Sequence, residues 1–120
     1  MKQFILMAIM LLTFEAVNAQ IGDCSVKGSR VEIYDADGRY KTYFNLSSGA
    51  ELSGFSSTII AVTKGSRVEI YDADGRYKTY FNLSSGGFVK NVVGNNIMVK
   101  KGHRIETYDE DGRYVTYRNE

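Results

Sequence analysis

Three pairs of aspartates are the residues best suited, by type and spacing, to bind a cation or to act as acid and base. The pairs are Asp35 with Asp37, Asp72 with Asp74, and Asp109 with Asp111. A calcium loop of the EF-hand type takes oxygen ligands at positions 1, 3 and 5 and a glutamate at position 12. With Asp72 and Asp74 at positions 3 and 5, Ile70 and Phe81 fall at positions 1 and 12. The motif fails, so the pairs predict turn chemistry, with no metal ion and no cofactor.

Other catalytic combinations are missing from the sequence. His103 is the only histidine, and one histidine without a Cys or His cluster does not make a metal site. The serines lie in Gly-Ser-rich segments that carry no nucleophile motif. We therefore predict that the protein is not an enzyme. The alternative is an accessory subunit, an inhibitor or an enzyme that acts through its loops.

Tyrosine is the residue type that most favours a binding role. The chain has nine tyrosines, and regularly placed tyrosines suit contact with a protein or a glycan. The predicted binding surface comprises Tyr34, Tyr43, Tyr71, Tyr80, Tyr108 and Tyr117. The competing interpretation is that these rings pack between repeats. Arginines recur beside the tyrosines, but acidic residues accompany them and the net charge is only +1, which argues against a nucleic-acid partner.

These residues belong to a repeated sequence that must position them. The 22 residues GSRVEIYDADGRYKTYFNLSSG occur identically at 28–49 and 65–86, and a diverged copy runs from 102 to 118. The copies start 37 residues apart, a period typical of repeat architectures. In each copy two strand-like runs flank an Asp-Gly turn signal, which predicts a β-hairpin. The predicted turn residues are Asp37, Gly38, Asp74, Gly75, Asp111 and Gly112.

A two-residue loop at Asp74-Gly75 fixes a register for the hairpin. In that register Tyr71 faces Lys78, Ile70 faces Thr79, Glu69 faces Tyr80 and Val68 faces Phe81. One face then carries Val68, Ile70, Thr79, Phe81 and Tyr77 and is expected to be core. The other face carries Glu69, Tyr71, Lys78 and Tyr80. A three-residue loop would set Ile70 opposite Lys78 instead.

Further apolar runs predict additional strands in each repeat. The run 58–63 precedes the second hairpin, 96–100 precedes the third, and 21–26 holds the same place before the first. Short apolar segments at 50–55 and 88–93 are candidates for a fourth strand, and no helix is expected. The units span about 20–47, 48–84 and 85–120 in a single domain, 20–120. The first unit is one strand short, and no obvious cap covers either end.

The pattern of an apolar strand, a glycine turn, a strand ending in Tyr-Asp, an Asp-Gly turn and a tyrosine strand resembles short β-propeller blades. This resemblance implies three tandem antiparallel β-meanders. The alternative is a three-fold, trefoil-like closed fold. The hairpins, such as Tyr71 to Arg76, also resemble the YD repeat. Propellers usually have about 4–8 blades, so three blades predict a homodimer, whereas a trefoil-like chain would be complete as a monomer.

The N-terminus has the pattern of an export signal. Lys2 precedes an apolar run at 4–12, and Val17-Asn18-Ala19 precedes a predicted cut before Gln20. The junction resembles signal peptides of Gram-negative exported proteins, which implies a periplasmic or extracellular location. The apolar run is too short to span a bilayer, so no membrane span is expected. Cys24 is the only cysteine, and we expect a half-buried side chain rather than lipidation or an intermolecular bridge.

Overall fold

A computed structural model describes residues 20–120, and the predicted signal peptide, 1–19, lies outside this part of the chain. The described residues form eleven β-strands and no helix. The first sheet contains β1 (Ile21–Lys27), β2 (Arg30–Asp35) and β3 (Tyr40–Asn45). The second contains β4 (Ala50–Phe55), β5 (Ile59–Lys64), β6 (Arg67–Asp72) and β7 (Tyr77–Asn82). The third contains β8 (Phe88–Val93), β9 (Asn96–Lys101), β10 (Arg104–Asp109) and β11 (Tyr114–Asn119).

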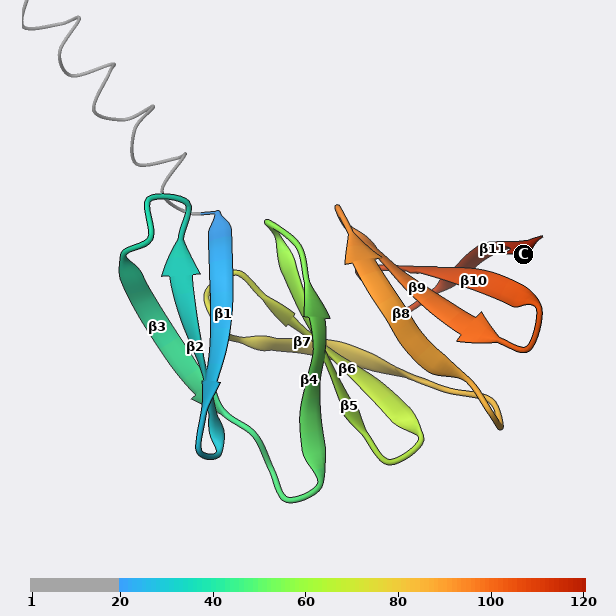
Figure 1. The fold of residues 1–120 in the computed structure, drawn as a ribbon, viewed down its shortest axis with the longest axis horizontal. Helices are drawn as coiled ribbons and strands as arrows, with labels where there is room; N and C mark the ends of the chain where they lie inside the picture. Colours follow the sequence, from blue (N-terminus) through green and yellow to red (C-terminus); the bar gives the residue numbers. More distant parts are fainter. Residues whose placement is uncertain (1–19) are drawn as a thin grey trace, which may run out of the picture.

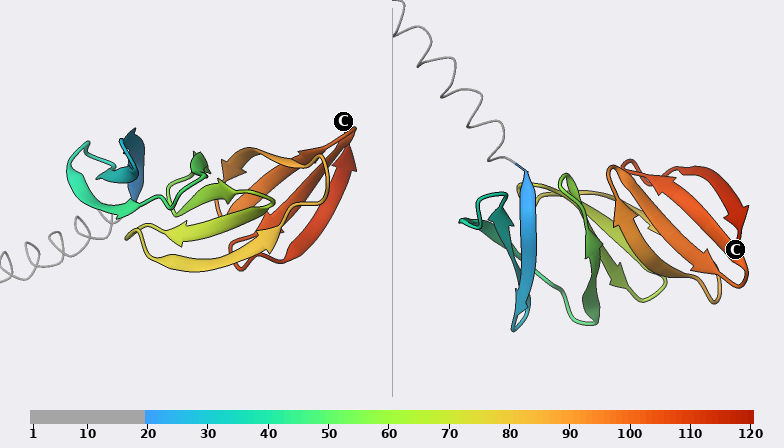
Figure 2. Two further views of the ribbon diagram at one scale, coloured as in Figure 1. Left: turned by 90° about the horizontal axis from the view of Figure 1, so that it is seen from below. Right: turned by 45° about the horizontal axis from the view of Figure 1, so that its top comes forward.

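The three sheets are antiparallel meanders arranged side by side in chain order, as Figures 1 and 2 show. Strand β4 lies against β8, and β1 lies against β4, so these strands form the inner side of the row. Strands β3, β7 and β11 are the outer strands of their sheets. This architecture is propeller-like, as predicted. The alternative of a trefoil-like closed fold is not observed, because the second sheet separates the first from the third.

The predicted two-residue hairpin loop is wrong. Gly75 N–H donates to the Asp72 carbonyl at 3.1 Å, and Asp72 N–H donates to the Arg76 carbonyl at 2.9 Å. Three residues, 73–75, therefore lie between the hydrogen-bonded pair Asp72 and Arg76. Gly75 takes the left-handed conformation with φ +78°. A loop of this kind joins a tight turn to one left-handed residue, which only glycine adopts without strain.

A β-bulge nevertheless restores the predicted register along most of the hairpin. Tyr71 pairs with Tyr77, the register then skips Lys78, and Ile70 pairs with Thr79. The predicted pairing of Tyr71 with Lys78 is therefore wrong, whereas Ile70 with Thr79 is correct. Because of the bulge, Tyr77 lies beside the Tyr71 ring rather than on the face of Phe81. The same skip occurs at Lys41 in the first sheet.

Two apolar cores hold the sheets together, one at each interface between neighbouring sheets. We call the side of a sheet that points toward the preceding repeat its upstream face, and the opposite side its downstream face. In the second sheet, Ile60, Val62 and Tyr71 of the upstream face pack on the first sheet. Val68, Ile70 and Phe81 of its downstream face pack on the third sheet. The second sheet is therefore apolar on both faces.

Each interface contains the same stacked pair of aromatic rings. Phe44 of the first sheet stacks on Tyr71 of the second, with centroids 4.1 Å apart and the planes at 14°. Phe81 of the second sheet stacks on Tyr108 of the third at 4.0 Å and 8°. Lysines at the bulges add polar contacts, because Lys41 donates to the Ala73 carbonyl and Lys78 pairs with Glu110. Each repeat thus carries the residues that join it to the neighbouring sheet, and we call this set of contacts the inter-sheet joint.

Candidate functional site

The six tyrosines predicted to form a binding surface fall into two groups. Tyr71 and Tyr108 are half-buried in the inter-sheet stacks. Tyr43, Tyr80 and Tyr117 are exposed by 45%, 45% and 51% on the outer strands. Tyr34 has the same sequence context as Tyr71, but no other sheet of the described residues packs on its ring. The competing interpretation, packing between repeats, therefore describes Tyr71 and Tyr108, and the outer-strand rings remain as the candidate surface.

An arginine covers each of these outer-strand rings. The guanidinium carbon of Arg30 lies 4.5 Å from the centre of the Tyr43 ring. The corresponding distances are 4.7 Å for Arg67 over Tyr80 and 4.0 Å for Arg104 over Tyr117. A cation at this distance is attracted to the face of the ring. Sequence reasoning identified both residue types but not their pairing, which depends on the hairpin register.

A glutamate and a second tyrosine complete each cluster. Arg67 donates to Glu69 Oε2 at 2.6 Å, and the Tyr71 hydroxyl donates to Glu69 Oε1 at 3.4 Å. Arg30, Glu32 and Tyr34 form the same network in the first sheet. The hydrogen bond from Arg30 lowers the pKa of the Glu32 carboxyl, which is only 5% exposed. Glu32 is therefore ionised at neutral pH, and it fixes the position of the arginine over its tyrosine.

Three further tyrosines widen the exposed aromatic surface. Tyr40, Tyr77 and Tyr114 are about half exposed and pack edge-to-face on Tyr34, Tyr71 and Tyr108. The bulge places them on the same side of the sheet as the arginine-covered rings. Each outer strand thus presents two tyrosines, one of them under an arginine.

The aspartate pairs serve the hairpin loops, as the failed calcium motif predicted. Asp72 Oδ1 accepts hydrogen bonds from the backbone N–H groups of Asp74 and Arg76 at 2.8 and 3.0 Å. Asp35 and Asp109 do the same in their loops. Side-chain oxygens used in this way stabilise the turn. Among residues 20–120, no group of three His, Cys, Asp or Glu residues is placed to hold a metal ion.

The single cysteine and histidine have unrelated surroundings. Cys24 is buried in the core between the first two sheets, and burial, reinforced by Asp23, raises the pKa of its thiol to about 12. His103 is exposed in the turn between β9 and β10, where its carbonyl accepts the Glu120 N–H at 2.8 Å. No helix within the described residues is long and apolar enough to cross a membrane.

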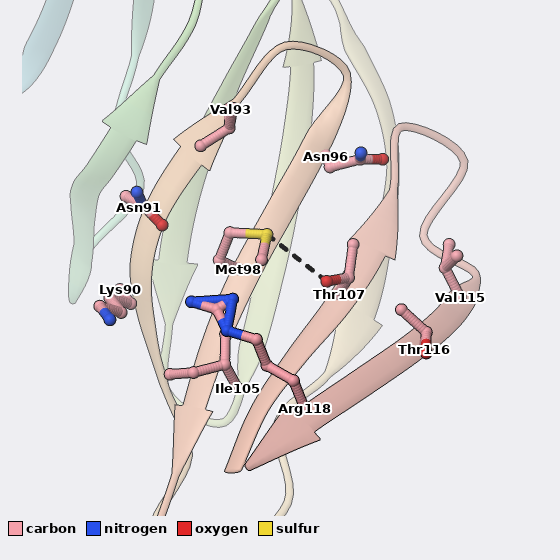
Figure 3. A pocket seen from close by; sticks show the side chains of 10 residues that line it. All are labelled: Lys90, Asn91, Val93, Asn96, Met98, Ile105, Thr107, Val115, Thr116 and Arg118. Carbon is pink, nitrogen blue, oxygen red and sulfur yellow. Dashed lines mark hydrogen bonds between the residues drawn. The ribbon is translucent and has the colours of Figure 1, made fainter. Parts of the chain in front are cut away.

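The third sheet has a hollow of about 520 Å³ on its downstream face, which no other sheet of residues 20–120 covers. Figure 3 shows Arg118 reaching from β11 across Ile105 toward the middle of the sheet. The repeat period sets Arg118 where Phe44 and Phe81 stand in the other sheets, and Thr107 where Ile33 and Ile70 stand. Asn96 likewise replaces Ile59. This terminal face therefore carries three polar side chains at positions that are apolar in the second sheet, beside apolar residues such as Met98 and Ile105.

The first sheet has a hollow of about 370 Å³ on its upstream face, lined by Asp23, Ser25, Lys27, Tyr34 and Gly38. In the second sheet the positions of Asp23 and Ser25 hold Ile60 and Val62, which are fully buried. No separate segment of residues 20–120 covers either terminal face. The two terminal faces instead carry polar substitutions within the repeat, which we call the polar caps, and they can be recognised only once the face of each strand residue is known.

Comparison with known proteins supports the fold. No protein-family model and no curated protein matches the sequence. Among solved structures, BamB from Moraxella catarrhalis is similar over 82% of this chain and 34% of its own length, with 14% identity and a TM-score of 0.52. A protein of unknown function from Bacteroides caccae is similar over 76% of this chain and 39% of its own length, with 13% identity and a TM-score of 0.51. The chain thus spans little more than a third of these propeller-like structures, and the likeness concerns the fold alone.

Proposed function

We propose that the protein is a binding module whose exposed outer-strand tyrosines contact a partner protein. The observation that carries the proposal is the threefold cluster in which Arg30, Arg67 and Arg104 cover Tyr43, Tyr80 and Tyr117. Tyrosine and arginine are enriched in protein interfaces and dominate their binding energy. The propeller-like fold and its likeness to BamB agree with an interaction role.

The clusters are prepared for binding before a partner arrives. Each arginine is held between a ring and a glutamate, although its side chain remains 42–44% exposed. A tyrosine and an arginine that are already ordered lose less conformational entropy on contact than free side chains do. The repeated spacing offers the same contact from each of three sheets, which favours an extended or repetitive partner.

We propose binding rather than catalysis, and a location outside the cytoplasm. The second proposal depends on residues 1–19 directing export. It predicts that the protein recovered from its own cells begins at Gln20 and carries no lipid on Cys24. Mass spectrometry that finds Met1 retained in the exported protein would contradict it.

The binding proposal is tested by photo-cross-linking in the cells that make the protein. A photoreactive phenylalanine analogue at the position of Tyr80 should cross-link one defined protein, whereas the same analogue at Glu51, on the inner strand β4, should not. A variant combining Tyr43→Ala and Tyr117→Ala should reduce the yield from position 80 about tenfold or more, because hot-spot residues dominate affinity. Equal cross-linking from positions 80 and 51 would refute a specific outer-strand surface.

A glycan is the other partner class that exposed tyrosines suit. A glycan array probed with the purified protein tests it directly. Binding to a glycan that the Tyr80→Ala variant loses, without any protein cross-link from position 80, would reassign the surface to carbohydrate. Neither a cross-link nor glycan binding would overturn the proposed function.

A further inference from the structure

We propose that each terminal face of this chain binds the opposite terminal face of a second copy. Two copies would then close head to tail into a ring of six sheets. The downstream face of the third sheet would take the upstream face of the partner's first sheet. This surface is separate from the outer-strand tyrosines, so the proposal stands or falls independently of the proposed function.

The internal interfaces define the geometry of such a junction. In both of them a phenylalanine of one sheet stacks on a tyrosine of the next. That tyrosine pairs across the strands with an isoleucine, Tyr71 with Ile60 and Tyr108 with Ile97. At each joint, one sheet therefore contributes a phenylalanine from its downstream face. The next sheet contributes a tyrosine and an isoleucine from its upstream face.

The terminal faces carry matched replacements at these three positions. Arg118 takes the place of the phenylalanine, and Asp23 takes the place of the isoleucine, whereas Tyr34 keeps the place of the tyrosine. Asp23 is the direct cross-strand neighbour of Tyr34. Packed as in the internal interfaces, the Arg118 guanidinium would lie on the Tyr34 ring beside the Asp23 carboxylate. A cation–ring contact and an ion pair would thus replace an apolar stack.

Both terminal groups are available for this contact. Arg118 and Asp23 are exposed, and each lines the hollow on its own terminal face. Neither side chain forms an ion pair within residues 20–120. At the hairpin tip Val115 occupies the lysine position of the internal joints, so it would rest on Ala36 of the partner copy.

Ring size selects two copies. A surface that binds a different surface of the same protein forms closed rings or open filaments. Residues 20–120 of one chain form three sheets, so two copies supply six sheets and three copies supply nine, whereas propellers hold about 4–8 blades. Only the pair falls in this range, and its two junctions are identical by symmetry.

Charge exchange tests the junction. Sedimentation equilibrium at low micromolar concentration should give the mass of two chains for the unchanged protein. Arg118→Asp and Asp23→Arg should each weaken association about 100-fold or more, because each places like charges face to face in both junctions. An equimolar mixture of the two variants should form a heterodimer, because one junction then pairs Asp at 118 with Arg at 23 and the other is unchanged.

A matched control separates this contact from general charge effects. Arg113→Asp makes the same change in the exposed hairpin loop of the third sheet and should leave the dimer intact. Circular dichroism checks that all three variants keep their β-structure. A monomeric unchanged protein, a dimer insensitive to Arg118→Asp, or variants that do not associate when mixed would each overturn the proposal.

Discussion

The hairpins at 28–49 and 65–86 have identical sequences but different surroundings. In the second, Tyr71 stacks on Phe44, and a methyl group on Gly75 would lie 3.3 Å from Ile33 Cδ1. In the first, Tyr34 faces an open hollow, and the space around Gly38 is empty. Hydrogen bonds within the two hairpins are nearly the same. The preceding sheet, and not the local sequence, therefore decides which contacts each residue makes, and we expect it to decide what each residue contributes to stability.

The largest difference is expected for the stacked tyrosine. Tyr71→Ala should lower the free energy of unfolding by about 3 kcal/mol, because it removes a half-buried ring and leaves a cavity against Phe44. Tyr34→Ala should cost about 1 kcal/mol or less, since the same intra-sheet contacts are lost without the stack. Urea unfolding in the Arg118→Asp background, where self-association does not contribute, measures both. Equal losses would show that the inter-sheet stack contributes little.

Substitutions of the loop glycines should also cost more stability in the second hairpin than in the first, but the difference should be smaller than for the tyrosines. Gly38→Ala should cost about 1 kcal/mol, because a side chain is forced to adopt positive φ. Gly75→Ala should cost about 2 kcal/mol, because the added methyl group also crowds Ile33 and Phe44. Thermal unfolding of the two variants compares them. A Gly38 variant less stable than the Gly75 variant would contradict the contact at the second hairpin tip.

The two faces of β1 can be compared by thiol chemistry. Because the pKa of Cys24 is raised to about 12, its thiol stays protonated in the folded protein at pH 8. Iodoacetamide should therefore label it about 100-fold more slowly than an exposed thiol. The control variant, Cys24→Ser with Ser25→Cys, moves the thiol to the open upstream face. Equal labelling rates would mean that the first interface opens readily.

Cys24 also makes stability depend on pH. The thiol of the unfolded chain ionises near its usual value of 9.0, whereas the folded protein holds the proton up to about pH 12. The folded state binds more protons between these values, so stability should fall as the pH rises through this window. The Cys24→Ser variant should lose this contribution.

The smallest effect concerns the end of the third sheet. Lys90 and Lys100 bind the Glu120 carboxylate at 2.8 and 2.6 Å and lower its pKa to about 2. The contribution of these exposed contacts should be present above about pH 4.5 and disappear as the pH falls toward 2. An NMR titration should show the pKa of Glu120 rising in Lys100→Gln. An unchanged pKa would contradict the ion pair between Lys100 of β9 and Glu120.

Sequence periodicity predicted the fold because the strand signals are local. Alternation in Arg67–Tyr71 and the glycine at 75 identified the hairpin, and the short apolar segments at 50–55 and 88–93 proved to be strands β4 and β8. The bulge at Lys78 was not predictable in this way, because it compensates for a loop one residue longer than expected.

The candidate site was predictable only in part. Tyr43 and Tyr80 hold the same position in two identical repeats, so the sequence identifies both as candidates. The position of Arg30 and Arg67 over these rings follows from the hairpin register. Tyr71 and Tyr34 also have identical neighbours along the chain, so no local pattern could separate the stacked ring from the open one. The polar caps, such as Arg118 in place of a phenylalanine, can be seen when the repeats are aligned. Their role can be inferred only when it is known that these residues lie on the terminal faces of the first and third sheets.

The identical stretches have a consequence for how the gene of this protein can change in length. Misaligned recombination between the two copies would remove or add 37 residues, which is one repeat. The protein would then lose or gain one sheet together with one inter-sheet joint. Because both polar caps lie outside the exchanged segment, the shortened and the lengthened chains would each keep them. The number of sheets can thus change in single steps, while the first and last sheets keep their polar faces and the internal interfaces keep their apolar ones.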